Sequence, residues 1–220
     1  MPLLTYERQV WESGCLRVAG VDEAGRGPLA GPVLAAAVVF DRSFVEAEQE
    51  GLLLGLTDSK QLAESRRETF YAILTTHPRF IDVGVGQADV GEIDRLNILR
   101  ATHLAMGRAV RALRLAPAHV LVDGLAVSGF PCPSTAIVKG DAKSLSIAAA
   151  SVVAKVTRDR YMRELDVRYP GYGFAQHKGY GAQQHVRRLL ELGPCPEHRR
   201  SFGPVREAEE IRSRRQRELF

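Results

Sequence analysis

Four acidic residues of this 220-residue chain stand where an apolar run ends or a helix is expected to begin. Asp22 and Glu23 follow the run LRVAGV, Asp123 follows AHVLV, and Asp141 comes shortly after STAIV. Because the ligands of an open sheet gather beyond the ends of its strands, we expect the four carboxylates to form one site.

Carboxylates crowded into one site repel one another, and a divalent cation or a raised pKa is the usual resolution. Oxygen ligands favour Mg²⁺ or Mn²⁺ over zinc. Two such ions about 4 Å apart can hold the attacking water and the leaving oxygen of an in-line phosphoryl displacement. The pattern therefore predicts metal-dependent hydrolysis of a phosphodiester. Taken singly, Asp123 could be a turn residue before a glycine, and Asp141 could cap the next helix.

A glycine-rich turn follows the first two acids. Gly25 and Gly27 give the backbone freedom there, and an arginine fork at Arg26 suits phosphate oxygens. We interpret this turn as a nucleotide contact. Neighbouring side chains of a strand point to opposite faces, so Asp22 and Glu23 share one site only if the strand ends at them and the backbone twists.

Two other interpretations of the turn stay open on the pattern alone. Gly25, Gly27 and Gly31 have nearly the spacing of a dinucleotide-binding loop. That motif opens a helix, whereas Pro28 and Pro32 interrupt this segment and an apolar strand follows. An Asp-Glu pair at a strand end is also common in solvated turns.

Several other polar residues have structural explanations. Lys60 in LTDSKQL is an isolated cation, and such a lysine is more often solvated than bound to phosphate. Ser65 and Glu68 have the spacing of a capping box. A predicted helix from about residue 92 has a core-facing stripe of Leu96, Leu99, His103, Met106, Val110 and Leu113. A histidine on such a stripe is expected to be a core residue rather than a ligand.

The elements that would position these residues alternate between strands and helices. Apolar or alternating runs predict strands at about 16–21, 32–40, 79–87, 118–122 and 134–138. Helical patterns cover about 64–76, the segment from 92, and 144–168. The first two strands are almost wholly apolar, as when both faces of a sheet are covered, so helices should flank the sheet.

Composition limits the classes of protein that fit. An apolar content of 45% suffices for one sizeable core, and a net charge of +4 leans toward polyanionic partners. The segment YGFAQHKGYGAQQHVRRLLELG mixes aromatic and basic residues, which suits nucleic-acid contact. Three widely spaced cysteines support neither a zinc site nor a disulfide framework and fit a reducing, cytosolic compartment. No signal peptide and no apolar run of about 18 residues is evident, so we expect no membrane partner.

Motifs spread over most of the chain closely resemble bacterial ribonuclease HII, the type 2 ribonuclease H family. They are GVDEAGRGPLAGPV, DSKQL, EIDRLNILRAT, VDG, KGDAKSLSIAAASVVAKVTRDR, YPGYGFAQHKGYG and HRRSFGPV. The resemblance implies an α/β, ribonuclease H-like fold, with a mixed central sheet flanked by helices and a C-terminal helical extension. We accordingly expect an N-terminal arm at 1–16, a catalytic domain at 17–193 that includes the C-terminal helical part, and a tail at 194–220.

Carried over by motif position, the resemblance implies that Asp22, Glu23, Asp123 and Asp141 are the catalytic, metal-binding carboxylates, with Mn²⁺ or Mg²⁺ as cofactor. No catalytic position of the family is lost. One departure is Ala63, where relatives commonly have a helix-capping serine, and this bears on local stability rather than catalysis.

The resemblance also implies the residues that contact the substrate. Gly25, Arg26 and Gly27 would contact the nucleotide around its 2′-hydroxyl, Lys60 a backbone phosphate, and Tyr180 the ribose at the RNA-to-DNA junction. A 2′-hydroxyl both donates and accepts, so backbone groups of a glycine turn can tell ribose from deoxyribose without reading a base. Cutting should therefore be independent of base sequence.

The family cleaves the RNA strand of RNA–DNA hybrids, and duplex DNA on the 5′ side of a single embedded ribonucleotide, leaving a 3′-hydroxyl and a 5′-phosphate. The resemblance thus implies an endonuclease of ribonucleotide removal whose partners are hybrids and ribonucleotide-containing duplex DNA. We expect it to be cytoplasmic and to act as a monomer. Ribonuclease HIII is the nearest rival, but it usually has an additional N-terminal domain and a different glycine turn. A catalytically silent hybrid-binding protein is the rival of another class, and it predicts a missing carboxylate.

Overall fold

The computed structural model describes residues 3–217 and the side chains of residues 3–214. Its strands are β1 (Val18–Ala24), β2 (Val33–Phe40), β3 (Ile81–Ala88), β4 (His119–Asp123) and β5 (Ser134–Ile137). Its helices are α1 (Thr5–Glu12), α2 (Arg42–Glu48), α3 (Glu64–Thr76), α4 (Val90–Leu96), α5 (Ile98–Arg111), the 3₁₀ turn η1 (Gly140–Ala142), α6 (Leu145–Arg168), α7 (Phe174–His177), α8 (Gln183–Leu192) and α9 (Gly203–Arg217). Within these residues no helix is long and apolar enough to cross a membrane.

The strands form one mixed sheet in the order β3-β2-β1-β4-β5. β1 pairs antiparallel with β2 and parallel with β4, and β4 pairs parallel with β5. This confirms the predicted mixed sheet with flanking helices. Every predicted strand is present, with bounds that differ from the prediction by at most three residues.

The chain divides into two compact units. The first comprises Met1–Ala24, Leu34–Gln87 and Thr102–Val156, and it contains most of the sheet. The second comprises Gly25–Val33, Ala88–Ala101 and Thr157–Phe220, and it includes the C-terminal helices α7 to α9. The predicted domain bounds at 16 and 193 stay predictions.

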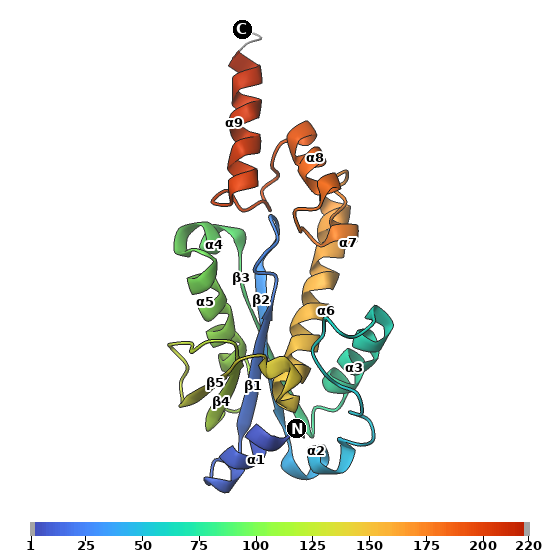
Figure 1. Ribbon diagram of the computed structural model, residues 1–220, viewed down its shortest axis with the longest axis vertical. Coiled ribbons are helices and arrows are strands. Elements are labelled where there is room, and N and C mark those ends of the chain that lie inside the picture. Colours follow the sequence, from blue (N-terminus) through green and yellow to red (C-terminus); the bar gives the residue numbers. More distant parts are fainter. Residues whose placement is uncertain (1–2, 218–220) are drawn as a thin grey trace. The chain divides into compact units, whose positions relative to one another are not determined.

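Two glycines let helices approach the sheet of the first unit closely. A Cβ atom at Gly20 of β1 would lie 2.1 Å from the carbonyl carbon of Ser146 in α6. One at Gly84 of β3 would lie 2.1 Å from the carbonyl oxygen of Ala109 in α5. Figure 1 shows α5 on one side of the sheet and α3 with the start of α6 on the other. Both faces are covered, which explains why β2 is buried along its whole length.

The N-terminal helix α1 is part of the core of the first unit. Trp11 is buried within it. Glu7 is buried too, and its Oε1 accepts hydrogen bonds from the hydroxyl of Ser144 (2.6 Å) and from the hydroxyl (2.6 Å) and amide (2.9 Å) of Ser146. A carboxylate is favourable at a helix N-terminus, where amides lack intrahelical partners. Glu7 therefore fixes α1 to the start of α6.

The second unit has a small core of its own around the segment Gly25–Val33. Ala30 packs with Met162, Leu165, Tyr172, Phe174 and Cys195. Leu29 packs with Leu189 of α8 and with Val205 and Ala208 of α9. The glycine-rich segment is thus held by residues from the C-terminal part of the chain.

Two local predictions are wrong. The helix expected from residue 92 is broken at Asn97, whose φ of 69° ends α4 and whose side-chain oxygen accepts from the amides of Leu99 and Arg100 to begin α5. Leu99 of the predicted stripe is 50% exposed and His103 is only half-buried. Met106, Val110 and Leu113 of the same stripe are buried as predicted. The capping box is also absent, because α3 begins at Glu64 after Ala63, which provides no side-chain cap.

Candidate active site

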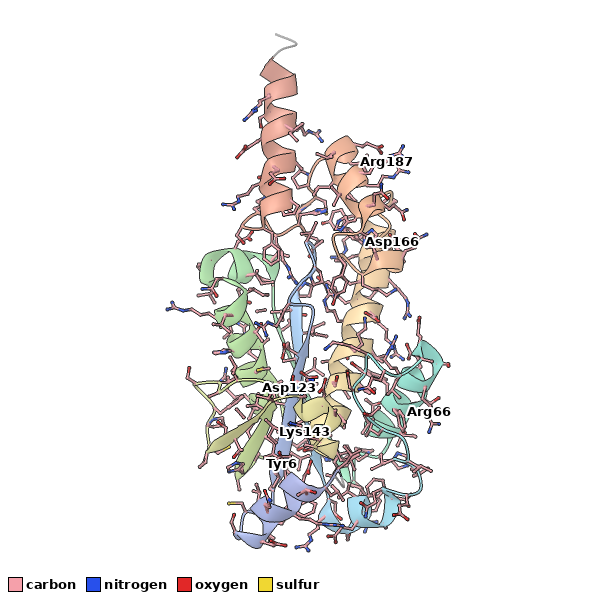
Figure 2. All side chains as sticks on the ribbon, viewed as in Figure 1. Tyr6, Arg66, Asp123, Lys143, Asp166 and Arg187 are labelled. Carbon is pink, nitrogen blue, oxygen red and sulfur yellow. The ribbon has the colours of Figure 1, made fainter. Side chains whose placement is uncertain are left out.

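Parallel pairing of β1 with β4 places two of the predicted carboxylates side by side. The register that pairs Val21 with Val122 aligns Asp22 with Asp123 at the next position. Paired residues of adjacent strands present their side chains on the same face of a sheet. Asp22 is buried, and Asp123, labelled in Figure 2, is half-buried at the carboxyl end of β4.

The turn after β5 brings the third carboxylate. Oδ1 of Asp123 accepts a hydrogen bond of 2.6 Å from the amide of Gly140, which ties η1 to β4. A Cβ at Gly140 would lie 2.7 Å from Cδ1 of Ile147, so a glycine allows this close approach. One carboxylate oxygen from each of Asp22, Asp123 and Asp141 then lies within 4.8 Å of the other two.

The negative charge of the three carboxylates is compensated only in part, by Lys60. Burial, followed by the negative charges of Glu23 and Asp123, raises the pKa of Asp22 well above its usual value. Burial, Asp123 and Asp58 raise the pKa of Asp141 to about 6. A divalent cation held by such crowded groups would restore their ionised form. Because all donors are oxygen atoms, the site fits Mg²⁺ or Mn²⁺.

Lys60 lies near these carboxylates. Burial acts to lower the pKa of Lys60, yet that pKa is raised overall. The negative charges that raise it are those of Asp58, Asp22, Asp141 and Asp123. Lys60 is itself exposed, and its amide donates to Oδ1 of Asp58 (2.9 Å), so the DSK turn carries an exposed cation at the edge of the carboxylate cluster.

Ser151 of α6 is a site residue that the sequence analysis missed. Its Oγ is hydrogen-bonded to Oγ of Ser59 (2.8 Å), and a hydrogen bond from Ser151 to Asp22 offsets part of the rise in the Asp22 pKa. Ser151 therefore links the DSK turn to the carboxylates. The available signal was a lone hydroxyl in the apolar run AAASVVA, because a buried hydroxyl requires a hydrogen-bond partner.

Glu23 is the predicted ligand that does not join the group of three. We expected the strand to end at the two acids, but β1 continues to Ala24 and pairs Glu23 with Ala35. Neighbouring side chains of a continuous strand point to opposite faces. Glu23 is still near enough for its charge to raise the pKa of Asp22. Its role as a fourth ligand stays a prediction.

The predicted nucleotide-contacting residues meet within the second unit. Gly25 has a φ of 96°, which favours glycine. A Cβ at Gly27 would lie 3.5 Å from Cε1 of Tyr180, so the tyrosine ring stands beside the turn. Arg26 and Gly27 are exposed, and Tyr180 is 47% exposed. Arg26, Gly27 and Tyr180 thus share one surface, and Gly25, which precedes them, is buried.

Two buried arginines that the sequence analysis did not single out hold this turn from inside. The guanidinium of Arg199 donates to the carbonyl oxygens of Gly25 (2.6 Å), Arg26 (3.0 Å) and Gly31 (2.9 Å). The guanidinium of Arg158 donates to those of Ala30 (3.2 Å), Pro32 (3.2 Å) and Lys178 (3.0 Å). Nothing in the sequence distinguishes these arginines from the many exposed ones.

A chain of buried histidines supports Tyr180. The amide of Cys195 donates to Nδ1 of His198 (3.0 Å), so the proton of that neutral ring is on Nε2, which lies 3.0 Å from Nε2 of His185. Nδ1 of His185 then donates to the carbonyl oxygen of Tyr180 (2.8 Å). Burial lowers the pKa of His185 to about 4 and that of His198 to about 3, so both rings are neutral at pH 7.

Comparison with known proteins covers nearly the whole chain. A family model described as ribonuclease HII matches residues 19–205. A ribonuclease HII of Geobacillus kaustophilus (strain HTA426) is 51% identical over 205 residues, 93% of this chain and 75% of that protein. One of Geobacter sp. (strain M21) is 52% identical over 206 residues, 93% and 85% of the two chains. The crystal structure of the ribonuclease H2 from Pyrococcus horikoshii OT3 superposes with a TM-score of 0.70 at 30% identity, covering 88% of this chain and 97% of that one.

Proposed function

Because the chain belongs to the ribonuclease HII family and is a ribonuclease H, an endonuclease acting on RNA–DNA hybrids, we propose that it also cuts duplex DNA at single embedded ribonucleotides. Cleavage on the 5′ side of the ribonucleotide would leave a 3′-hydroxyl and a 5′-phosphate. The observation that carries the proposal is the convergence of three aspartate oxygens within 4.8 Å. We propose further that the enzyme acts as a monomer in the cytoplasm.

The carboxylates would bind the divalent cations. Asp22, Asp123 and Asp141 are the proposed ligands, with Glu23 as a fourth. Two Mg²⁺ or Mn²⁺ ions, when bound, would activate the attacking water and neutralise the leaving 3′-oxygen. The fixed geometry of the ligands comes from the chain itself, because Asp22 is set in β1 and Asp123 is held by the amide of Gly140.

Recognition of the ribose is assigned to the second unit. Backbone groups of Gly25, Arg26 and Gly27 would bond the 2′-hydroxyl, and the ring of Tyr180 would pack on the ribose at the RNA–DNA junction. The support is that Arg26 and Gly27 of the turn are exposed and that the ring of Tyr180 lies beside Gly27. Lys60 in the first unit would contact a backbone phosphate, as an exposed cation that lies near several carboxylates.

The test is cleavage of an end-labelled DNA duplex that contains one ribonucleotide, resolved on a sequencing gel with Mg²⁺, with Mn²⁺ and with chelator. Metal-dependent cutting at one phosphodiester, 5′ to the ribonucleotide, is expected, with no cutting of an all-DNA duplex. A duplex that is bound but stays intact with both metals would refute the proposal. Light scattering during size exclusion checks the monomer.

A further inference from the structure

Two positive charges are buried in the second unit without an ion-pair partner among the described residues. The side chains of Arg158 and Arg199 are 1% and 0% exposed. Among the described residues, no carboxylate lies within ion-pair distance of either, and all their hydrogen bonds go to backbone carbonyls. Burial lowers the pKa of Arg158 to about 10 and that of Arg199 to about 9, the latter also through repulsion by Arg158. The negative charges of Asp159 and Asp94 oppose part of the fall in the pKa of Arg158 and of Arg199, respectively. Both side chains nevertheless stay charged at neutral pH.

Buried charges of the same sign are unfavourable unless an opposite charge or a set of dipoles compensates them. Carbonyl dipoles provide part of that compensation here. Five carbonyls of the segment Gly25–Val33 accept hydrogen bonds from the two guanidinium groups. In most segments such carbonyls bond to backbone amides or to water instead. An anion bound on the outer side of the segment would add to the compensation.

The hydrogen bonds of Arg199 also fix which way the amides point. In a trans peptide the carbonyl and the following N–H point in opposite directions, and no cis peptide occurs in the described residues. The carbonyls of Gly25 and Arg26 point at Arg199, so the amides of Arg26 and Gly27 point away from it. Both residues are exposed. Successive outward amides with positive charge behind them are the arrangement of an anion-binding nest.

Gly25 brings the buried charge close to the turn. A Cβ at this position would lie 2.0 Å from Nε of Arg158, so only a glycine leaves room for the guanidinium directly behind the backbone. The Tyr180 side chain is near enough to both arginines to affect their pKa values, which locates the charges under the surface that carries Tyr180. The electrostatic field of a charge decreases with distance, so this close backing strengthens the field at the turn.

We propose that Arg158 and Arg199 are positioning residues that make the turn at Gly25–Gly27 a binding site for a phosphate of the nucleic acid. Neither arginine touches the substrate. They aim the amides of the turn outward and supply the positive field that a phosphate compensates. The inference rests on the proposed function in that the phosphate belongs to the strand that is cut.

The first test measures anion binding in chelator, without any reaction. Inorganic phosphate should raise the melting temperature of the wild type more than chloride does at matched ionic strength. Arg199→Gln should lose this phosphate-specific shift, and Arg199→Lys, which keeps the charge but not the fork, should retain part of it. Arg42→Gln is the control, because it removes the same charge from an exposed helix of the first unit. Equal phosphate-specific shifts in wild type and Arg199→Gln would overturn the proposal.

The second test measures binding of a ribonucleotide-containing DNA duplex by fluorescence anisotropy, again in chelator. Arg199→Gln should raise the Kd about tenfold and reduce the slope of log Kd against log salt by about 1, as expected for one lost phosphate contact. With metal, KM should rise while kcat changes little. If kcat falls while KM and the salt slope stay unchanged, Arg199 has only a structural role.

The lysine variant and wild-type cleavage separate the role of the arginines from misfolding and from a failure of the proposed function. If Arg199→Gln does not fold, Arg199→Lys carries both tests, and a folded lysine variant with no phosphate-specific shift overturns the proposal. Wild-type cleavage is measured in parallel. Wild-type protein that cuts the duplex but shows no phosphate-specific shift refutes the role of the arginines alone, whereas phosphate binding without cutting refutes the proposed function alone.

Discussion

The two units of the protein each gather charges of one sign, but they accommodate them differently. In the first unit, burial and the negative charges of neighbouring acids raise the pKa values of Asp22 and Asp141, which means that they can take up a proton. In the second unit, the arginines stay charged at neutral pH and are compensated by six backbone carbonyls. Carboxylates can bind protons as long as no metal ion is present. Guanidinium groups stay charged, so the backbone carbonyls of the fold must compensate their charge.

This difference predicts how each unit responds to mutation. Removal of a carboxylate should remove chemistry and relieve repulsion in the metal-free protein. Removal of the glycine that accommodates an arginine should damage the fold of the second unit. Four changes test the contrast, and they follow from the largest expected effect to the smallest.

Asp22→Asn should reduce metal-dependent cleavage at least about 10³-fold, because a buried ligand loses its charge. In chelator the same variant should be more stable than wild type at pH 7. The pKa of Asp22 is raised in the folded state, so the folded protein loses stability as pH rises above the usual value near 3.8, and asparagine avoids that loss. Single-turnover cleavage and thermal melts measure the two effects.

Glu50→Gln is the control for that prediction, since it removes an exposed acid of the same unit. It should change neither cleavage nor melting temperature. Unchanged turnover in Asp22→Asn would show that Asp22 is not a metal ligand. The two units would then not differ in the way described.

Gly25→Ala should destabilise the protein by about 3 kcal/mol or more, because a methyl group would overlap the buried Arg158 and the backbone has a positive φ. Gly14→Ala is the matched control, with a φ of 91° against 96° but nothing within 4 Å of the added atom. It should cost about 1 kcal/mol from backbone strain alone. Urea denaturation of both variants isolates the clash, and equal losses would mean that Arg158 does not back the turn.

Acidification should affect the two units in opposite directions. The pKa values of His185 and His198 are depressed to about 4 and 3 in the folded state. Their full contribution to the free energy of unfolding is therefore present above about pH 6.5, the usual pKa of histidine. It decreases as the pH falls, by about 1.4 kcal/mol for each histidine at pH 5.5. The raised pKa of Asp141, about 6, has the opposite effect, because the folded state takes up its proton first and gains stability as the pH falls.

Amide hydrogen exchange at pH 7 and 5.5 in chelator, corrected for intrinsic rates, reports the two units separately. Protection should fall in the second unit and hold or rise in the first. His198→Gln should remove about half of the acid effect. Parallel changes in both units would contradict the assignment of the neutral histidine chain.

Ala63→Ser should add about 1 kcal/mol, because Ala63 is the N-cap of α3, has the extended backbone of a cap and makes no side-chain bond. Cleavage should not change. This variant measures how a gain in stability alone, without any change of charge, affects cleavage. The other three predictions are compared with that result. A change in kcat would show that the helix after the DSK turn is coupled to the carboxylates.

The aspartates could be predicted because strand ends and turns mark them in the sequence. Asp22, Asp123 and Asp141 each follow an apolar run, and strand pairing alone brings the first two together. The strands and the long helix α6 were predicted for the same reason, since their apolar patterns are continuous. The register that makes Asp22 and Asp123 neighbours, however, depends on pairing between segments about 100 residues apart, which no local pattern reveals.

The arginines and histidines could not be predicted, because their roles depend on burial. Arg158 and Arg199 lie in charged segments where a solvated arginine is the usual expectation. Asn97 was missed because a positive φ at a non-glycine residue has only a weak local signal, and Leu99, just after the helix break, is exposed. Glu23 was expected to share the site on the assumption that β1 ends at the acids, and the strand continues to Ala24.

The hydrogen bonds of Glu7 have a consequence for the order in which the protein folds. Glu7 and Ser146 are separated by 139 residues, so α1 leaves the ribosome long before its partner exists. β1 likewise precedes its parallel neighbour β4 by about 100 residues. Contacts so distant in sequence close late and slow folding. During synthesis the first helix must therefore stay unpaired until α6 has begun, and a chaperone that shields an exposed Trp11 over that interval should increase the yield of native enzyme.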